Sequence, residues 1–272
     1  GTRAPSGEPV FAAIAGGVGR LPRALAGSGR FEVRTSTTVR EIIRTPGGFH
    51  LICAAVPAPE IVEVDAVVVA TPPSKAAQLL RGVAPAAAAE LRDVETASLA
   101  IVTFAFPAGA GTAEVPSGSG LLVAVREGFA VKAVTLSSQK WPIDTDGLVL
   151  MRASVGRAGE NQILQREDPA LIALVQHELR ALIGVTAEPV DALVTRWGGA
   201  LPQYAVGHVE RVRRIRAAVD RVPGLAVCGA TYDGVGIPAC IASAYAAADR
   251  VANSTSGDVT GPGVPAFVPG GQ

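Results

Sequence analysis

Hydrophobic residues in the first quarter of the chain follow strand patterns. Three segments are rich in β-branched and aromatic residues: residues 31–35, 39–44 and 48–56. The turn signal Pro46-Gly47-Gly48 stands at the start of the last segment. A further run, Ala66–Ala70, shows no alternation, which is typical of a strand buried on both faces of a parallel sheet. The pattern predicts a small meander followed by one strand of a helix-covered sheet.

The middle of the chain predicts one helix and then an antiparallel sheet. An alanine-rich stretch over residues 74–92 has the composition of a helix. Four strand patterns follow: residues 98–106, 121–125, 129–136 and 148–155. The short turn Arg126-Glu127-Gly128 separates the second from the third. We expect a hairpin at that turn and mostly antiparallel pairing.

Apolar residues at helical spacing dominate the last third of the chain. Asp168 as N-cap and Pro169 at the first helical position predict a helix, whose apolar face carries Leu171, Leu174, Val175, Leu179 and Leu182. The remaining predictions are a strand over 189–197, a helix over 207–221 with Val209, Val212, Ile215 and Val219 on one face, a short buried strand over 224–229, and a helix over 238–251. Residues 253–272 have no period and are predicted to be disordered.

Composition and charge exclude several classes of protein. The 272 residues are 49% hydrophobic and only 18% charged, so the chain is globular and not disordered. With 24 basic and 24 acidic side chains it lacks the positive excess of a nucleic-acid binder, and no apolar run is long enough to span a membrane. The histidines stand apart from acidic and cysteine neighbours, so no metal site is predicted. Because the chain opens with Gly1 and its only methionine is Met151, we expect a piece of a longer protein.

The strongest local signal for chemistry is the glycine-rich segment at residues 229–236. A buried strand runs through Gly229, Gly234 and Gly236 directly into a helix. Glycine lets a ligand approach the backbone closely, and the free N–H groups of a first helical turn favour negative charge. Because the spacing does not match GxGxxG, these residues alone fit either a site for an anion or flat ligand or an ordinary strand-turn-helix junction.

Five segments, in order along the chain, resemble a known enzyme family. They are FAAIAGGVGRLPRAL, EGFAVKAVTLSSQKWP, VLMRASVGRAGE, RWGGALPQYAVGH and the glycine-rich segment continued to Val251. Together they resemble the oxygen-dependent coproporphyrinogen III and protoporphyrinogen oxidases of the FAD-dependent amine oxidase superfamily. The family's N-terminal strand, GxGxxG turn and helix have no counterpart, because Gly16-Gly17-Val18-Gly19 follows no β run and is spaced differently. The chain therefore resembles the C-terminal portion of such an enzyme.

The resemblance implies an α/β (α+β) fold in two parts. A partial Rossmann-like FAD-binding domain would take residues 1–72 and 196–252, and a mostly antiparallel substrate-binding domain residues 73–195. The residues implied for FAD are Val39, Ala70, Thr71, Trp197, Gly229, Val235, Gly236 and Ile237, and those for the substrate cavity are Leu121 and Val123. Val39 could instead be an ordinary strand residue, and Trp197 an aromatic residue with a purely structural role. No catalytic acid or base is assigned.

The implied reaction is the oxidation of a porphyrinogen to a porphyrin by FAD, with O2 as acceptor and hydrogen peroxide as product. Coproporphyrinogen III is favoured over protoporphyrinogen IX. A related amine oxidase, a carotenoid desaturase and an inactive binding fragment are the alternatives. The implied location is cytoplasmic, while peripheral membrane contact, product transfer to ferrochelatase and the oligomeric state are left open. Five arginines on the predicted helix 207–221 form either a solvated face or a site for a polycarboxylate or anionic lipid: Arg211, Arg213, Arg214, Arg216 and Arg221.

Overall fold

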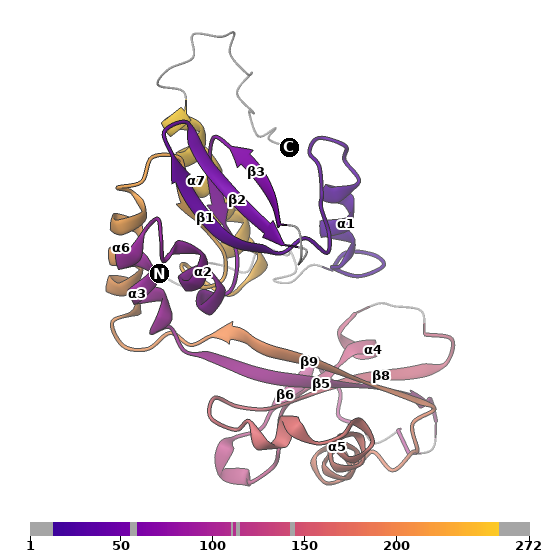
Figure 1. Ribbon diagram of the computed structural model, residues 1–272. Helices are drawn as coiled ribbons and strands as arrows, with labels where there is room; N and C mark the ends of the chain where they lie inside the picture. The colour runs from indigo at the N-terminus through magenta and orange to yellow at the C-terminus, as the bar shows by residue number, and fades with distance from the viewer. Residues whose placement is uncertain (1–12, 55–58, 110, 113–114, 142–144, 256–272) are drawn as a thin grey trace, which may run out of the picture.

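A computed structural model describes residues 13–54, 59–109, 111–112, 115–141 and 145–255. Its elements form two groups, one above the other in Figure 1. The first group takes its elements from both ends of the chain, and the second takes the middle. Two long strands, β5 (Thr96–Pro107) and β9 (Asp191–Pro202), pair antiparallel and run side by side from the first group into the second.

The first group combines an antiparallel meander, a parallel pair of strands and helices. Its elements are α1 (Arg20–Ala26), β1 (Val39–Thr45), β2 (Gly48–Ala54), β3 (Pro59–Val64), β4 (Val67–Val69), α2 (Pro73–Leu80), α3 (Pro85–Arg92), α6 (His208–Val219), β10 (Leu225–Val227) and α7 (Ile237–Thr255). The meander has the order β1-β2-β3, and β4 pairs in parallel with β10. One core joins side chains from both ends of the chain, including Phe49, Leu80, Leu91 and Ile215.

The second group is a five-stranded antiparallel sheet with the order β6-β7-β8-β5-β9. Its further elements are β6 (Gly120–Leu122), η1 (Val125–Glu127), β7 (Val131–Leu136), α4 (Ser137–Lys140), β8 (Leu148–Val155), η2 (Gln162–Gln165) and α5 (Asp168–Ile183). Helix α5 covers one side of the sheet, where Phe104, Met151 and Val175 are fully buried in a second core. This core forms because alternate strand residues face the apolar stripe of the helix.

The opposite side of this sheet is turned away from α5, and we call it the open face. The short helix α4 lies at its β8 end, where the Ser138 hydroxyl accepts the Leu150 N–H (2.8 Å). Cross-strand pairs place Ile101, Ser154 and Thr195 on one row of that face and Thr103, Arg152 and Leu193 on the next. Leu99 and Trp197 form a further pair on the same side. Figure 1 shows α5 below the sheet and the first group above it, so the open face is turned toward the first group.

Most predicted elements are present, and the differences have physical causes. Residues 31–35 are not a strand, because they lie exposed and pair with no described strand. The predicted helix over 74–92 is two helices, broken around Gly82, with Pro85 starting α3. Val68 in the middle of β4 is 39% exposed, so that strand is not buried on both faces. The sequence patterns also missed β3.

Two predicted helix boundaries and one predicted face also differ. Asp168 is the first residue of α5, not its N-cap, and its carboxylate pairs with the Arg196 guanidinium. Val209 is 64% exposed, whereas Val212, Ile215 and Val219 of the same helix are buried. Helix α7 continues to Thr255, beyond the predicted start of the disordered tail, and the rest of that tail lies outside the described residues.

The arginines of α6 are engaged in ion pairs within the chain. Arg211 and Arg214 both pair with Glu90 of α3, and Arg216 pairs with Asp233. Arg213 pairs with Glu210 one turn earlier. This helix therefore contacts α3 and the glycine-rich segment through its charges, and four of the five arginines are not a free cationic patch.

The Glu90 pairs should make stability fall in acid. A hydrogen bond from Arg214 lowers the pKa of Glu90 from its ordinary 4.5. The stabilisation is therefore complete above that value and is lost as the pH falls through the lower pKa of the folded protein. We expect the Tm difference between the wild type and Glu90→Gln to shrink between neutral pH and about pH 3. The exposed Glu32 provides a control, since Glu32→Gln should give no such convergence; parallel Tm curves for Glu90→Gln would contradict the expectation.

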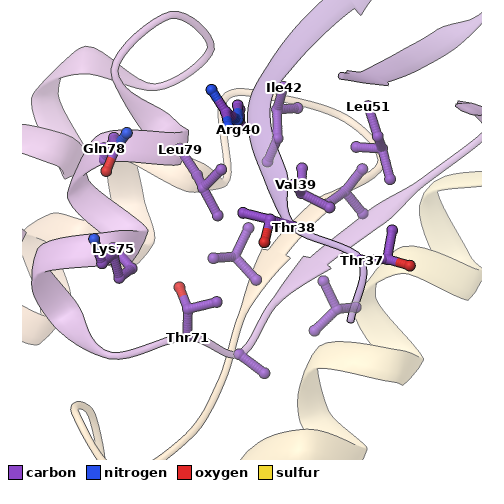
Figure 2. A pocket seen from close by; sticks show the side chains of 14 residues that line it. Thr37, Thr38, Val39, Arg40, Ile42, Leu51, Thr71, Lys75, Gln78 and Leu79 are labelled. Atoms are coloured by element: carbon purple, nitrogen blue, oxygen red, sulfur yellow. The ribbon is translucent and has the colours of Figure 1, made fainter. Parts of the chain in front are cut away.

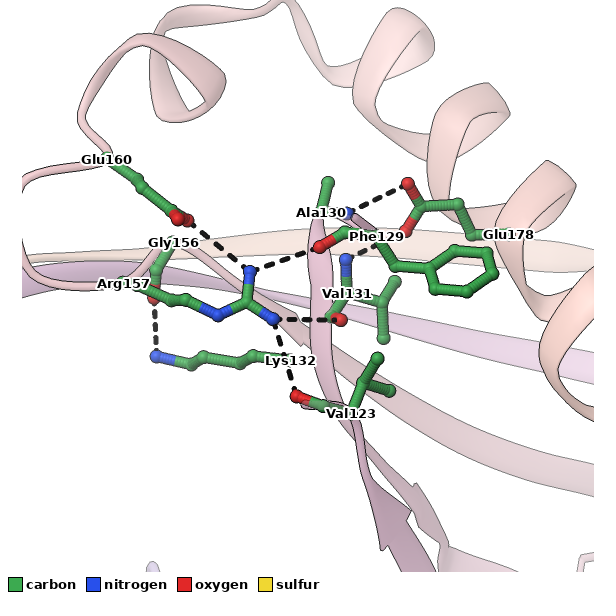
Figure 3. Close-up of polar contacts among 9 residues, drawn as sticks. All are labelled: Val123, Phe129, Ala130, Val131, Lys132, Gly156, Arg157, Glu160 and Glu178. Carbon is green, nitrogen blue, oxygen red and sulfur yellow. Dashed lines mark hydrogen bonds and ion pairs between the residues drawn. The ribbon is translucent and has the colours of Figure 1, made fainter. Parts of the chain in front are cut away.

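A buried carboxylate and a half-buried arginine fix the start of β7 (Figure 3). Glu178 of α5 is 8% exposed and accepts hydrogen bonds from the backbone N–H groups of Ala130 (2.9 Å) and Val131 (2.7 Å). Arg157 donates to the Phe129 carbonyl (3.1 Å) and pairs with Glu160 (3.4 Å). These contacts join α5 and the loop after β8 to the hairpin, so the hairpin is held against the sheet.

Candidate functional site

A cavity of about 730 Å³ opens between the meander, β4 and α2. Its apolar wall comes from Val39, Leu51 and Val68, and its polar groups come from the segment before β1, the turn after β4 and the exposed side of α2. Figure 2 shows Thr37, Thr38, Thr71, Arg40, Lys75 and Gln78 around this space. The exposure of Val68 is explained by this cavity, because its side chain lines it.

An unpartnered polar atom belongs to one of the residues that line the cavity. The Thr71 hydroxyl is buried and has no hydrogen-bond partner among the described residues. Leaving a buried hydroxyl without a hydrogen bond costs folding free energy. Because Thr71 lines the cavity, a ligand with polar groups could supply the missing hydrogen bond. Arg40 and Lys75 add two cations to the lining. A ligand that combines an apolar ring with negative charge fits these residues, as a flavin dinucleotide does.

Three of the predicted cofactor residues lie together at this place. Val39, Ala70 and Thr71 all line the cavity. Gly229 lies beside them, because Val69 pairs with Val227 and a Cβ added to Gly229 would lie 3.9 Å from the Ala70 carbonyl oxygen. The parallel pairing of β4 and β10 therefore brings residues from both ends of the chain to one edge.

The glycine-rich segment forms a tight bend into α7 that other residues hold in place. Gly229 has φ 116° and donates its N–H to the Ser243 hydroxyl (3.1 Å), and Gly234 has φ 143°, a region that favours glycine. Tyr204 donates its hydroxyl to the Ala230 carbonyl and stacks on His208 at 3.9 Å. Burial raises the pKa of Tyr204, so it stays a neutral donor. The segment RWGGALPQYAVGH thus supports the bend from outside.

The remaining predicted cofactor residues are exposed, and none of them lines this cavity. Val235 and Ile237 are 51% and 49% exposed at the start of α7, and Gly236 lies between them. Trp197 is 51% exposed on the open face of the sheet. Trp197 is not among the residues that line the cavity with Val39 and Thr71, so a shared role of the three toward one ligand stays a prediction.

The two predicted substrate-cavity residues lie on the wrong side of the hairpin. Val123 is buried in the core beneath the sheet, and Leu121 packs against that core. Leu122 lies between them and is 87% exposed. This placement does not support Leu121 and Val123 as cavity residues, because a strand turns successive side chains to opposite faces.

Several residues of this region were not predicted from the sequence. Lys75 and Gln78 reach the cavity because α2 starts immediately after Thr71, which the Thr-Pro-Pro end of the strand could have indicated. Tyr232 is 3% exposed in the bend, with its hydroxyl unpartnered among the described residues, and burial raises its pKa. A second cavity, of about 540 Å³, lies between α6, α7 and β10.

Comparison with known proteins decides the family. The model of the family described as flavin containing amine oxidoreductase matches residues 4–252. The chain belongs to this family. Its flavin cofactor agrees with the FAD predicted above, and the α/β fold agrees with that of solved relatives.

The chain is 36% identical over 258 residues to a protein named coproporphyrinogen III oxidase from Mycobacterium tuberculosis, covering 93% of this chain and 53% of the relative. It is 35% identical over 187 residues to the protein of that name from Bacillus subtilis, covering 68% and 39%. A solved structure described as a protoporphyrinogen oxidase from Exiguobacterium sp. 255-15 matches with a TM-score of 0.74 and 31% identity, covering 88% of this chain and 50% of that one. The chain spans about half the length of the curated relatives it matches.

Two further findings concern the part of the chain that the structure describes. No helix in this part of the chain is long and apolar enough to cross a membrane. Within the same residues, no group of three or more His, Cys, Asp or Glu side chains is placed to hold a metal ion.

Proposed function

We propose that the protein containing this chain oxidises coproporphyrinogen III to coproporphyrin III. The observation that carries the proposal is the 36% identity to a coproporphyrinogen III oxidase across 93% of the chain. The macrocycle would lose six electrons and six protons, and three O2 molecules would be reduced to three hydrogen peroxide molecules. Protoporphyrinogen IX is the second candidate substrate, since a tobacco protein named protoporphyrinogen oxidase, chloroplastic, is 26% identical over 258 residues.

The residues at the first cavity would hold FAD, which when bound supplies the acceptor for the electrons. Val39 and Ala70 would contact apolar parts of the cofactor, and the Thr71 hydroxyl would gain the partner that it lacks among the described residues. Arg40 and Lys75 would balance negative charge. At the bend, Val235, Gly236 and Ile237 would offer the N-terminus of α7 to the electron-rich edge of the flavin.

The two groups of elements would divide the work between cofactor and substrate. Residues 1–72 and 196–252 would form part of the FAD-binding domain. Helices α2 and α3 would belong with them, although the predicted boundary at residue 73 puts them in the substrate-binding domain, because their apolar residues share the core of the first group and Lys75 lines the cavity. The rest of residues 73–195 would form the substrate-binding domain. In this arrangement the open face holds the macrocycle against the flavin and excludes water. The free cysteines Cys53, Cys228 and Cys240 are in keeping with a cytoplasmic location.

The free side of β10 would pair with a strand of the nucleotide-binding fold. All three residues of β10 are buried, yet among the described residues only β4 pairs with it. A two-stranded parallel sheet rarely stands alone, because such sheets bury both faces between helices. The second cavity, beside Ala226 and Val227, would receive the helix or turn that follows such a strand.

A fluorescence assay on the complete gene product tests the function. We expect a yellow protein that converts coproporphyrinogen III to the fluorescent porphyrin faster than protoporphyrinogen IX, and only with O2. Equal or inverted rates would overturn the substrate preference. Oxidation of amines without oxidation of either porphyrinogen would support the amine oxidase alternative, and a colourless, inactive protein would support the binding fragment.

A further inference from the structure

On the strands of the open face, the described residues combine apolar and hydroxyl side chains with one central cation. Leu99, Ile101, Leu150 and Leu193 lie on this side, are partly or largely exposed, and do not pack against the core under α5. Arg152 stands among them on β8, the middle strand of the five. The open-face residues of β8 are, in order, Leu148, Leu150, Arg152 and Ser154, so the arginine follows two leucines.

Arg152 has no ion-pair or hydrogen-bond partner among the described residues. Directly opposite it are Thr103 on β5 and Thr135 on β7, two neutral hydroxyl side chains. The acidic strand residue on this face is Asp191 at the far end of β9, and its carboxylate accepts the Ala192 N–H at 2.8 Å. Arg157, in the loop after β8, is by contrast engaged with the Phe129 and Val131 carbonyls and with Glu160. An exposed guanidinium that has no partner among the described residues, with hydroxyl side chains beside it and apolar ones further out, is complementary to a flat apolar ligand that carries a carboxylate.

We propose that Arg152 binds a propionate carboxylate of the tetrapyrrole and so sets the position of the macrocycle on the open face. This inference rests on the proposed function and adds a specificity residue to it. Guanidinium and carboxylate can form two parallel hydrogen bonds, which fix orientation as well as charge. The adjacent threonines can donate further hydrogen bonds to the same group.

The position of Arg152 relative to Trp197 supports this assignment. Both side chains lie on the open face, separated by two strand spacings and four residues along the strands. These spacings put their Cα atoms roughly 16 Å apart. Trp197 is the residue predicted to lie near the flavin, so a macrocycle between the two would have one edge at the reaction site and a propionate arm at Arg152.

Binding measurements on the complete protein test the role of Arg152. The ligands are coproporphyrin III and its tetramethyl ester, which lacks the carboxylate charges, and binding is followed by porphyrin fluorescence. We expect Arg152→Met to raise Kd for coproporphyrin III by about tenfold or more, and KM for coproporphyrinogen III similarly, with a small change in kcat. Kd for the ester should be unchanged, and Arg152→Lys should recover part of the loss. Arg213→Met, on the far helix α6, is the control for loss of one exposed arginine.

Each other outcome overturns the assignment. An unchanged Kd for the acid in Arg152→Met would show that Arg152 binds no propionate, and the proposed function would stand if the wild type still oxidises coproporphyrinogen III. An equal loss for acid and ester, or a lowered flavin content, would show a structural role. A wild-type protein that neither binds nor oxidises a porphyrin would overturn the proposed function together with this inference.

Discussion

Replacing Val68 by tryptophan should yield a complete protein that purifies with about one tenth or less of the wild-type flavin. Val68 is 39% exposed on β4 and lines the cavity of about 730 Å³. An indole at this position would occupy the space that we assign to FAD. The strand cannot move away to make room, because its backbone is paired with β10. Flavin content is measured from the visible absorbance relative to protein.

Ile61→Trp provides a matched control for this experiment. Ile61 lies on β3, is 56% exposed and pairs with Ile52, whereas Leu51 next along β2 lines the cavity. Because neighbouring residues of a strand face opposite ways, the Ile61 side chain points away from the cavity. We expect normal flavin in this variant. Normal flavin in both variants would show that the cavity is not the FAD site.

Glu178→Ala should be among the most destabilising single substitutions in the second group. It removes a buried carboxylate that satisfies the N–H groups of Ala130 and Val131. Two buried donors would lose their partner, at a cost of about 3 kcal/mol. For a protein about twice as long as this chain, as the relatives are, that corresponds to a fall in Tm of about 3 °C. Thermal unfolding of the complete protein, followed by circular dichroism, measures the change.

Glu188→Ala is the control for loss of a glutamate. Its side chain is 74% exposed and pairs with Arg180, and such surface pairs contribute at most about 1 kcal/mol. A Tm for Glu178→Ala as high as that of Glu188→Ala would mean that water or relaxation of the hairpin replaces the carboxylate. The contacts of Glu178 with Ala130 and Val131, drawn in Figure 3, would then not determine the position of the hairpin.

The sequence predicts elements well where a local pattern determines them. Strands β5, β8 and β9 and helix α5 were predicted from periodicity, because their apolar residues face a single core. Residues 31–35 have the same kind of pattern but no strand beside them, and pairing cannot be seen in a single segment. The break at Gly82 was missed because alanine-rich composition outweighed one glycine and one proline.

The candidate site was predicted only in part, for related reasons. Val39, Ala70, Thr71 and Gly229 come together through a parallel pairing that the resemblance implied and local patterns do not reveal. Leu121 and Val123 were assigned to a cavity because hairpin register, which decides the face of each side chain, was unknown. The partners of the α6 arginines, such as Glu90, lie far away in the sequence. Arg152 could not be singled out from the sequence, because only the strand register shows that the residues opposite it, Thr103 and Thr135, carry no charge.

The parallel pair of β4 and β10 has a consequence for how the protein matures. Residues 67–69 leave the ribosome before the sheet of the second group is made, but their partner at residues 225–227 appears only after it. Contacts between such distant segments slow folding, since a long loop must close first. We expect nascent chains that stop before β10 to bind no cofactor, because Val68 and Ala70 would lack the strand that supports them. Flavin capture would then report that synthesis of the C-terminal region is complete.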